Sequence, residues 1–434
     1  MFAYLVAVAF RLFGASTYVL RGTAAAVGVL GVVAVWLAVR RFGRVPALIA
    51  MAWTAGSLWM ICVSRDGFRN ITTVALGGLA LAAALCWAHR PIRWWALAAG
   101  AAAGAGLWTF QPLKLAPLLL IVWLLWLRHA DRARYLEMRH TALFALLGYL
   151  LVGGPMLWTA ITDAIHYFAR AASVAAFNPI AQSPDSFPAH VLKTLGMFLV
   201  TGDPNQRHDV DALPLLGPLL FIPFALGVWR AWRRRSDASH ALLIAGLVVY
   251  LLPPVLAVEG GAPHFLRSLG LVPFVAALVA IGCLEAAQLV AAAARRWWPA
   301  VSPVASPVAV GIGAGAVLLV GLASIRTYLE RPVAERYDAY SFALVALARA
   351  ADHGPGTAVV VDSYSAFDVQ FLDAPDPPTI VDPGQRITSP KLYSLLVAPS
   401  RDAIASATDQ ATAARAAVVA VDIRGQPVAW QVQP

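Results

Sequence analysis

The chain has 434 residues, of which 60% are hydrophobic and only 13% are charged, and its mean hydropathy is +0.69. About a quarter of the residues in an average soluble domain are charged, so this composition excludes a soluble enzyme and indicates a polytopic membrane protein. The net charge of +10 does not indicate nucleic-acid binding, because the arginines are concentrated in short segments between apolar runs.

The start of the chain lacks the features of a signal peptide. Met1–Leu20 has no basic N-terminal region and no clear cleavage site, and Arg11 and Gly14 interrupt its apolar residues. We therefore predict an interfacial helix here. The three cysteines all fall inside apolar runs without metal-ligand spacing, so we interpret them as packing residues; they are Cys62, Cys86 and Cys283.

Apolar segments of about the length of a membrane span follow one another along the chain. We predict about ten transmembrane helices from them, at 22–39, 45–63, 71–88, 94–110, 115–127, 141–160, 215–232, 238–257, 271–290 and 304–325. A shorter apolar piece, Val191–Val200, is expected to lie at the membrane surface or to re-enter the membrane.

The arginine clusters define one topology. They fall in alternate loops, at 40–44, 90–93, 128–139, 230–235 and 295–296, and the positive-inside rule makes these loops cytoplasmic. The remaining connections and both termini then lie on the extracytoplasmic side. An N-terminus on that side with no span before it leads us to expect a further helix upstream of Met1, and hence a truncated chain.

A more polar tail begins near residue 327. Short β-rich runs predict strands at 357–361, 379–381, 395–397 and 417–421, with helices at 338–352, 365–372 and 402–415. The predicted fold class is thus an all-α polytopic membrane domain over residues 1–326, followed by a small extracytoplasmic α/β domain over 327–434. The tail has no glycine-rich phosphate loop and no catalytic-triad motif, so we expect a structural or docking role for it.

Ionisable side chains recur at the extracytoplasmic ends of the predicted helices. The first cluster, Ser64–Asn70, places three of them at a membrane–water boundary with almost no loop around them. Arginine and lysine at such a boundary suit a phosphate headgroup, and histidine adds a hydrogen bond or a proton. We predict a cationic pocket for a lipid phosphate, with candidate substrate-binding residues Arg65, Arg69, Lys114, Asn205, Arg207, His208, His264 and Arg267.

Plainer interpretations of the same residues stay open. His264 is also a candidate helix cap, and Arg207 with His208 is also compatible with a solvated loop. No set of His, Asp and Glu has clear metal-ligand spacing, so we predict no metal site. A divalent cation remains possible at the acidic side chains of Asp203, Asp209, Asp211 and Glu259.

Five stretches resemble a known family in the family's own order: FAYLVAVAFRLFGASTYVLR, SRDGFR, LWTFQPLKLAP, GDPNQRHDVDALPLL and PHFLRSLGLVP. The chain resembles polytopic glycosyltransferases of the GT-C architecture, in particular bacterial relatives of dolichyl-phosphate-mannose–protein mannosyltransferases and lipid A aminoarabinose transferases.

The resemblance implies inverting transfer of a sugar from a polyprenyl-phosphate donor to an acceptor hydroxyl. The acceptor would be a protein, glycan or lipid at the extracytoplasmic face of a bacterial plasma membrane, with membrane lipids and no nucleic acid as partners. A general base would deprotonate the acceptor, and cations would stabilise the leaving lipid phosphate. Arg65, Arg69, Lys114, His264 and Arg267 are the first candidates for the phosphate side.

One part of the family pattern is missing. The catalytic acidic residues of this family lie in a first extracytoplasmic loop, and the start of this chain resembles the part that follows that loop. The resemblance therefore assigns no catalytic base here, and Asp66 is a candidate only by its position. A chain that binds the donor without turning it over is one expectation.

Two other functions are consistent with the sequence. A transporter or flippase for a lipid-linked or anionic solute would need charges inside the spans or helices broken by glycine or proline. Pro253, Pro254 and Pro273 are candidate breaks, but there is no internal repeat, and Glu285 is the main charge within a span. A structural remnant with an idle pocket is the third interpretation. Charges at one face favour surface chemistry.

Overall fold

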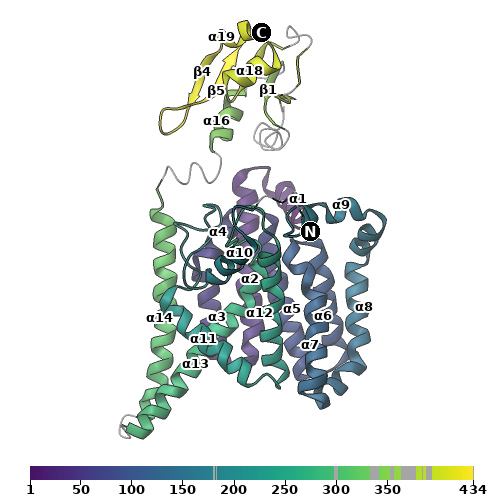
Figure 1. The fold of residues 1–434 in the computed structure, drawn as a ribbon, viewed down its shortest axis with the longest axis vertical. Helices are drawn as coiled ribbons and strands as arrows, with labels where there is room; N and C mark the ends of the chain where they lie inside the picture. Colours follow the sequence, from purple (N-terminus) through teal and green to yellow (C-terminus); the bar gives the residue numbers. More distant parts are fainter. Residues whose placement is uncertain are drawn as a thin grey trace. The chain divides into compact units, whose positions relative to one another are not determined.

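The computed structural model describes residues 1–178, 181, 183–297, 302–332, 342–351, 356–362, 378–383, 385–387 and 393–433. Its internal contacts divide the chain into two compact units, Met1–Glu330 and Arg331–Pro434. The first unit is helical, and the second contains a β-sheet (Figure 1).

Every predicted apolar segment forms helix in the first unit. The helices, joined in part by short 3₁₀ turns, are α2 (Thr17–Val39), α3 (Arg44–Gly56), α4 (Leu58–Arg65), α5 (Thr72–His89), α6 (Arg93–Ala105), α7 (Ala116–Ala130), α8 (Arg132–Thr162), α11 (Gly217–Arg233), α12 (Ala238–Leu256), α13 (Val272–Trp297) and α14 (Ser302–Glu330).

Eight of the ten predicted spans have the length and apolar character of a full crossing. Seven described helices are long and apolar enough to cross a membrane, and α3 with α4, bent by 55° at their junction, makes an eighth. The other two are the 13-residue α6, which a 3₁₀ turn continues to Trp108, and the 17-residue α11, at the lower end of the length that a crossing needs. The bend falls at Ser57. Its side chain accepts a hydrogen bond from Met60 N and so caps the start of α4. The protein is thus a multi-pass integral membrane protein.

The predicted loop 128–139 is almost entirely helical. Only Asp131 separates α7 from α8, and its side chain caps α8 by accepting a hydrogen bond from Arg134 N. Arginine, leucine, glutamate and methionine favour helix, so the polar stretch extends α8 beyond its apolar part. The prediction of a loop was wrong because the polarity of this stretch reflects where α8 leaves the membrane, not where helix ends.

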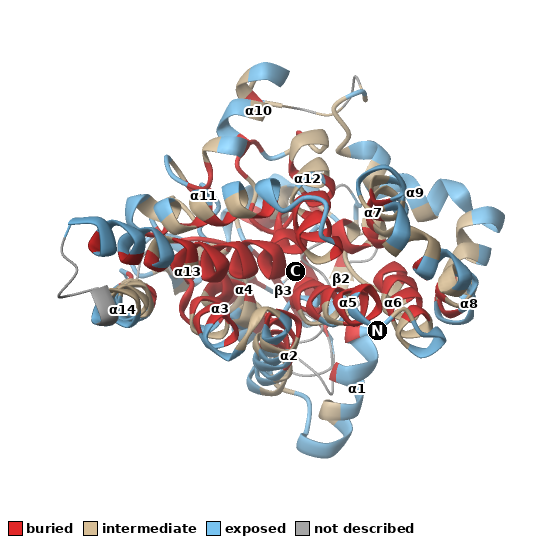
Figure 2. Ribbon diagram, turned by 90° about the horizontal axis from the view of Figure 1, so that it is seen from below, coloured by how far each residue is buried: buried red, intermediate tan, exposed pale blue. Residues whose placement is uncertain are grey.

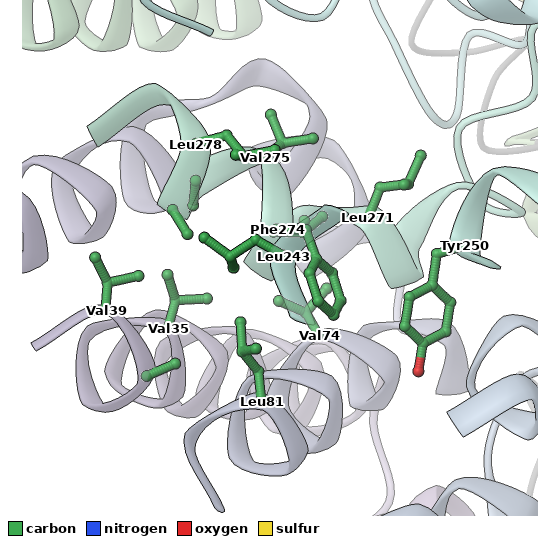
Figure 3. Packing of buried hydrophobic residues seen from close by; sticks show 14 of the residues in the cluster. Val35, Val39, Val74, Leu81, Leu243, Tyr250, Leu271, Phe274, Val275 and Leu278 are labelled. Atoms are coloured by element: carbon green, nitrogen blue, oxygen red, sulfur yellow. The ribbon is translucent and has the colours of Figure 1, made fainter. Parts of the chain in front are cut away.

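Helix α13 forms the centre of the first unit. In its most apolar stretch, 89% of the residues are buried. Figure 2 shows α13 surrounded by the other helices. Its Phe274 and Leu278 face side chains of α12 and α5, including Leu243 and Leu81 (Figure 3). By contrast, only 11% of the residues in the most apolar stretch of α14 are buried, although the mean hydropathy of that stretch is 2.3. A helix that is apolar yet exposed in this way is suited to face lipid.

Glycines allow two pairs of helices to approach closely. On α6, a Cβ atom at Gly100 would collide with the backbone of Ala145 in α8, and Gly148 meets the backbone of Leu97 in the same way. On α13, Gly282 lies against the backbone of Pro223 in α11. Small residues with such close backbone contact are characteristic of helix packing in membranes.

Three short helices lie at one end of the bundle: α1 (Phe2–Phe13), α9 (Ala164–Ser173) and α10 (Phe187–Gly196) (Figure 1). Helix α1 exposes large apolar side chains, including Leu12 and Phe13, as expected for a helix that lies in the membrane interface. The predicted short apolar piece 191–200 supplies the end of α10.

The second unit contains a five-stranded sheet in the order β2-β1-β3-β5-β4. Strand β1 (Thr357–Val360) is parallel to β2 (Thr379–Val381) and β3 (Leu395–Ala398), and β5 (Pro427–Val432) is antiparallel to β3 and β4 (Ala417–Val421). Three described helices accompany the sheet: α16 (Phe342–Ala351), α18 (Arg401–Ala407) and α19 (Gln410–Ala414).

The four predicted strands are confirmed, and β5 was missed. It pairs with β3 and β4, and its buried residues are Ala429 and Val432, but a run of six residues with Gln431 inside is a weak signal in sequence. The predicted helix 402–415 is two helices, α18 and α19, because Asp409 caps a new one. The predicted helix 338–352 is described only from Phe342, and the predicted helix 365–372 lies outside the described residues.

Candidate functional site

The charged stretch Ser64–Asn70 contains the end of α4, a tight turn at 66–68 and the start of η2 (Arg69–Ile71). Gly67 has a φ of 76° and lies 3.3 Å, measured from an ideal Cβ position, from the side chain of Leu20. Only glycine adopts this backbone conformation without strain. The turn leaves Arg65 and Arg69 exposed, with Asp66 half-buried between them.

Arg69 and Lys114 are neighbours in the fold although 45 residues separate them in the sequence. Lys114 lies in η4 (Gln111–Leu115). The positive charge of Arg69 is close enough to repel its ammonium group. The Lys114 Nζ lies 4.0 Å from the centre of the Tyr167 ring in α9. Among the described residues, no carboxylate forms an ion pair with either cation. Two like charges without a counter-ion make this place suitable for an anion.

Arg65 points to a different part of the bundle. Its guanidinium carbon lies 5.5 Å from the centre of the Tyr328 ring, near the end of α14. A guanidinium over an aromatic face is held by a cation–π interaction. The structure therefore groups Arg69 with Lys114 and places Arg65 beside α14.

Asp203 joins two loops that are distant in sequence. Its Oδ2 atom accepts hydrogen bonds from His208 Nδ1 at 2.8 Å and from the backbone N–H of Phe265 at 2.7 Å. Its Oδ1 atom accepts a bond from the backbone N–H of Asn205 at 2.8 Å. This one carboxylate therefore connects residues 201–216 with residues 257–271.

His264 lies next to the same carboxylate. Its Nδ1 atom is 3.8 Å from Asp203 Oδ2, too far for a hydrogen bond, and it is buried without a hydrogen-bond partner. The rings of His208 and His264 are 5.2 Å apart, centre to centre. Trp59 in α4 donates its indole N–H to the Phe265 carbonyl at 3.1 Å, which fixes this loop on the bundle.

The surroundings set the protonation of both side chains. Burial alone would raise the pKa of Asp203, but the hydrogen bond and the charge of His208, together with His264, lower it below its usual value. Burial, reinforced by the charge of Arg267, lowers the pKa of His264 to about 3. At neutral pH, Asp203 is thus an anion and His264 is a neutral imidazole.

Asp209, six residues beyond Asp203, has the opposite behaviour. Only 1% of it is exposed, and burial together with the charge of Asp203 raises its pKa to about 8. Its Oδ2 atom is buried without a hydrogen-bond partner and lies against Gly202. A side chain on Gly202 would collide with this oxygen, so glycine is needed there for close approach.

Arg267 and α9 complete the arrangement. Arg267 is buried and donates a hydrogen bond to the Ala257 carbonyl at 2.6 Å, and burial lowers its pKa to about 10, so it stays charged at neutral pH. On α9, Arg170 Nη1 lies 2.8 Å from Glu259 Oε2. Helix α9 therefore contacts Lys114 through one side chain and the loop of Arg267 through another.

The predicted residues thus fall into several places. Arg69 and Lys114 form one cationic pair, His208, His264 and Arg267 belong to the two joined loops, and Arg65 lies apart. Asn205 and Arg207 form a turn at the surface, in which the Asn205 side chain accepts the backbone N–H of Arg207 at 3.0 Å. We expected neither Tyr167 nor Arg170 at the site. The sequence signal for these two residues is the run of polar side chains in HYFAR, residues 166–170, within an otherwise apolar stretch.

The comparisons with known proteins concern the fold and the first part of the chain. Residues 1–158 match the family model described as dolichyl-phosphate-mannose-protein mannosyltransferase. No curated protein matches the chain.

Solved structures match over almost the whole chain. The structure of ArnT from Cupriavidus metallidurans bound to undecaprenyl phosphate has a TM-score of 0.60 and 15% identity, with 99% of this chain and 87% of that chain covered. The apo ArnT structure gives 0.61 and 17%, covering 99% and 86%. The apo oligosaccharyltransferase of Archaeoglobus fulgidus gives 0.51 and 13%, covering 95% of this chain and 64% of that one.

These matches and the helical bundle lead to the same assignment. At identities of 13–17%, the structural matches establish the fold only. The chemistry has to be argued from the residues of the site. The chain is therefore a polytopic membrane protein with the GT-C glycosyltransferase fold, and its first 158 residues match the dolichyl-phosphate-mannose-protein mannosyltransferase family.

Proposed function

We propose that this protein is a membrane glycosyltransferase that moves a sugar from a polyprenyl-phosphate-linked donor to an acceptor hydroxyl at the extracytoplasmic face. The observation that carries the proposal is the pair of Arg69 and Lys114, which has no acidic partner among the described residues. The fold shared with a protein bound to undecaprenyl phosphate supports the choice of anion.

The pair has the properties that a leaving lipid phosphate requires. When the sugar–phosphate bond breaks, negative charge grows on the phosphate oxygens, and fixed cations lower the energy of that transition state. Arg69 offers a planar fork of donors, and Lys114 offers a compact charge held against Tyr167. Arg267 lies on the loop that Glu259 connects to α9, the helix that also carries Tyr167, so it is the next cation to test.

The proton acceptor for the incoming hydroxyl is not assigned. Asp66 is half-buried and follows directly after α4, between the two arginines of the turn, so it is the candidate to test. His264 is neutral at neutral pH and could accept a proton, but its low pKa makes it a weak base. Binding and turnover are therefore to be measured separately.

A transport function has less support. Glu285, the main charge within a predicted span, forms an ion pair with Arg230, which also donates to Gln288 at 2.8 Å. These contacts join α11 to α13 and neutralise the carboxylate, so this charge has a structural explanation. Charged groups gathered at one end of the bundle favour chemistry at that end over a path across it.

The first test is binding of undecaprenyl phosphate to the purified full chain in lipid nanodiscs. Arg69→Ala and Lys114→Ala should each weaken binding by about 1.5–3 kcal/mol, because each removes a hydrogen bond between charged groups. That corresponds to roughly 10- to 150-fold in Kd. Arg326→Ala is the matched control, since Arg326 is exposed and pairs with Glu330 on α14.

The results discriminate clearly between outcomes. Unchanged affinity in both Arg69→Ala and Lys114→Ala, with normal thermal unfolding, would remove the phosphate site from the proposal. Transfer of a labelled sugar from a polyprenyl-phosphate donor then tests catalysis, with Asp66→Asn as the variant. Intact binding without any transfer by the unmodified chain would identify a donor-binding protein that does not turn over.

A further inference from the structure

The geometry points to a site for a divalent transition-metal ion, zinc(II) in first place, with Asp203, His208 and His264 as its protein ligands. One donor atom from each side chain lies within 4.8 Å of the other two. Imidazole and carboxylate together are a typical ligand set for zinc. This inference does not depend on the proposed sugar transfer.

Hydrogen bonding explains only part of this cluster. The bond from His208 Nδ1 to Asp203 accounts for one histidine, but His264 Nδ1 is buried, has no hydrogen-bond partner and lies 3.8 Å from the carboxylate. A buried polar atom without a partner is costly. A metal ion among the three side chains would give this nitrogen a partner and would replace the proton shared by His208 and Asp203.

The donor types and the nearby charges are compatible with a dication. Metal ions bind carboxylate oxygens and imidazole nitrogens, and Asp203, His208 and His264 bring one such donor each to within 4.8 Å of the others. The charged groups that face the cluster are of both signs. Arg267 disfavours a cation through its positive charge, whereas Glu259 acts on Arg267 with the opposite sign. The carboxylate of Asp203 within the cluster supplies the charge that a dication needs.

Neighbouring backbone groups hold the carboxylate in place. The N–H groups of Phe265 and Asn205 each donate to one oxygen of Asp203, so the carboxylate cannot rotate freely. Such outer hydrogen bonds commonly orient the ligands of protein metal sites. Three protein ligands leave a fourth position of a tetrahedral ion for water or another oxygen ligand.

A bound ion would fasten two loops together. Asp203 and His208 belong to residues 201–216, whereas His264 belongs to residues 257–271, which the indole of Trp59 fixes to α4. The ion would therefore cross-link the ends of two helices, α11 and α13, that begin after these loops. Metal binding should consequently stabilise the folded chain.

The experiment uses the full chain purified in detergent, stripped with a chelator and then equilibrated with zinc(II) alone. After desalting, elemental analysis should find one zinc ion per chain. His208→Ala and His264→Ala should each retain less than a tenth of this amount, while His166→Ala should retain it fully. His166 is a suitable control because it is an exposed histidine on α9, where 83% of its side chain is accessible.

Two measurements on the unmodified chain keep the inference testable if the alanine variants fail to fold. Zinc(II) should raise the midpoint of thermal unfolding, and cobalt(II) should produce the visible absorption bands of a protein-bound ion with nitrogen ligands. A chain that retains no zinc and shows neither effect would overturn the inference. Equal zinc retention by folded His208→Ala, His264→Ala and unmodified chains would overturn it as well.

Discussion

Asp203 and Asp209 show how two identical side chains in one loop reach opposite states. Both are buried, with 3% and 1% of each exposed. Asp203 accepts bonds from His208 and from backbone N–H groups, so it stays ionised. Burial favours the neutral form of Asp209 more than the backbone bond from Val210 offsets it, and the negative charge of Asp203 adds to the effect of burial.

The pH dependence of stability follows from these states. Asp209 has a pKa raised from 3.8 to about 8, so its contribution is complete below pH 4 and is lost as the pH rises towards 8. His264 has a pKa lowered from 6.5 to about 3, so its contribution is complete above pH 6.5 and is lost as the pH falls. The two effects oppose each other between pH 4 and 6.5, and Asp209 acts alone above that.

We therefore expect the chain to lose stability between pH 6.5 and 8, by at most about 2 kcal/mol, since one proton contributes about 1.4 kcal/mol per pH unit. Asp209→Asn should abolish this loss, because asparagine has no proton to release. Asp402→Asn is the control, since Asp402 is an exposed carboxylate in the second unit. Thermal unfolding in detergent across this pH range measures the difference. Identical pH profiles for Asp209→Asn and the unmodified chain would contradict the assignment.

At the scale of the helices, close contact depends on single glycines. Gly100 on α6 faces the backbone of α8, and Gly104 lies against Tyr149 and Gly153 one turn further along. Without a hydrophobic driving force between helices in lipid, such contacts supply much of the packing energy. Gly315 on α14 is exposed and has open space around its Cβ position.

This difference gives a matched pair of substitutions. Gly100→Ala should destabilise the membrane unit by about 1–3 kcal/mol, because the methyl group forces α6 away from α8. Gly315→Ala should be neutral or slightly stabilising, since alanine favours helix over glycine by about 1 kcal/mol. Thermal unfolding of both variants in the same detergent tests this. Equal stability of the two variants would show that α6 and α8 are not packed as closely as described.

Helix α9 connects the two groups of candidate site residues, which its sequence alone did not predict. Tyr167 contacts Lys114, and Arg170 contacts Glu259, so one ten-residue helix touches both groups of candidate site residues. Its neighbour α8 ends at Thr162, and Asp163 alone separates the two. The site residues therefore depend on α9 for their relative placement.

At the scale of the whole molecule, the orientation in the membrane decides where the candidate site acts. We predict that the arginine-rich connections face the cytoplasm and that Arg331–Pro434 lies outside it. The alternating positions of the arginine clusters are the reason, since no other orientation places all of them on one inner side.

Cysteine labelling on intact cells tests this orientation. Ser406→Cys in the second unit should react with a membrane-impermeant maleimide, and Ser236→Cys, next to the arginines that follow α11, should react only after the cells are lysed. Both positions are exposed. The native cysteines, Cys62, Cys86 and Cys283, are buried and should give little background. Labelling of Ser236→Cys alone on intact cells would reverse the topology.

Much of the fold could be predicted because its signals are local. The apolar run of Leu271–Val290 predicts a span, and α13 is that span, because length and hydropathy decide whether a segment can cross a bilayer. The bend at Ser57 and the short α6 were not predicted, because both depend on how the chain packs against its neighbours. Of the site, the sequence indicated His208, His264, Arg69 and Lys114 as candidates without indicating which of them meet.

By itself, the sequence determined that this protein is a multi-pass helical membrane protein of GT-C type with a smaller α/β unit, since hydropathy and motif order are properties of the linear chain. Only the tertiary structure decided that Asp203 and His264 share one cluster, because 61 residues separate them and no spacing rule covers that distance. It also decided that Arg65 lies over Tyr328 of α14 and Lys114 over Tyr167 of α9, although both are cations at helix ends in the sequence. Hydrogen bonds from His208 and the backbone keep Asp203 ionised, whereas burial favours the neutral form of Asp209, and both conditions exist only in the folded chain.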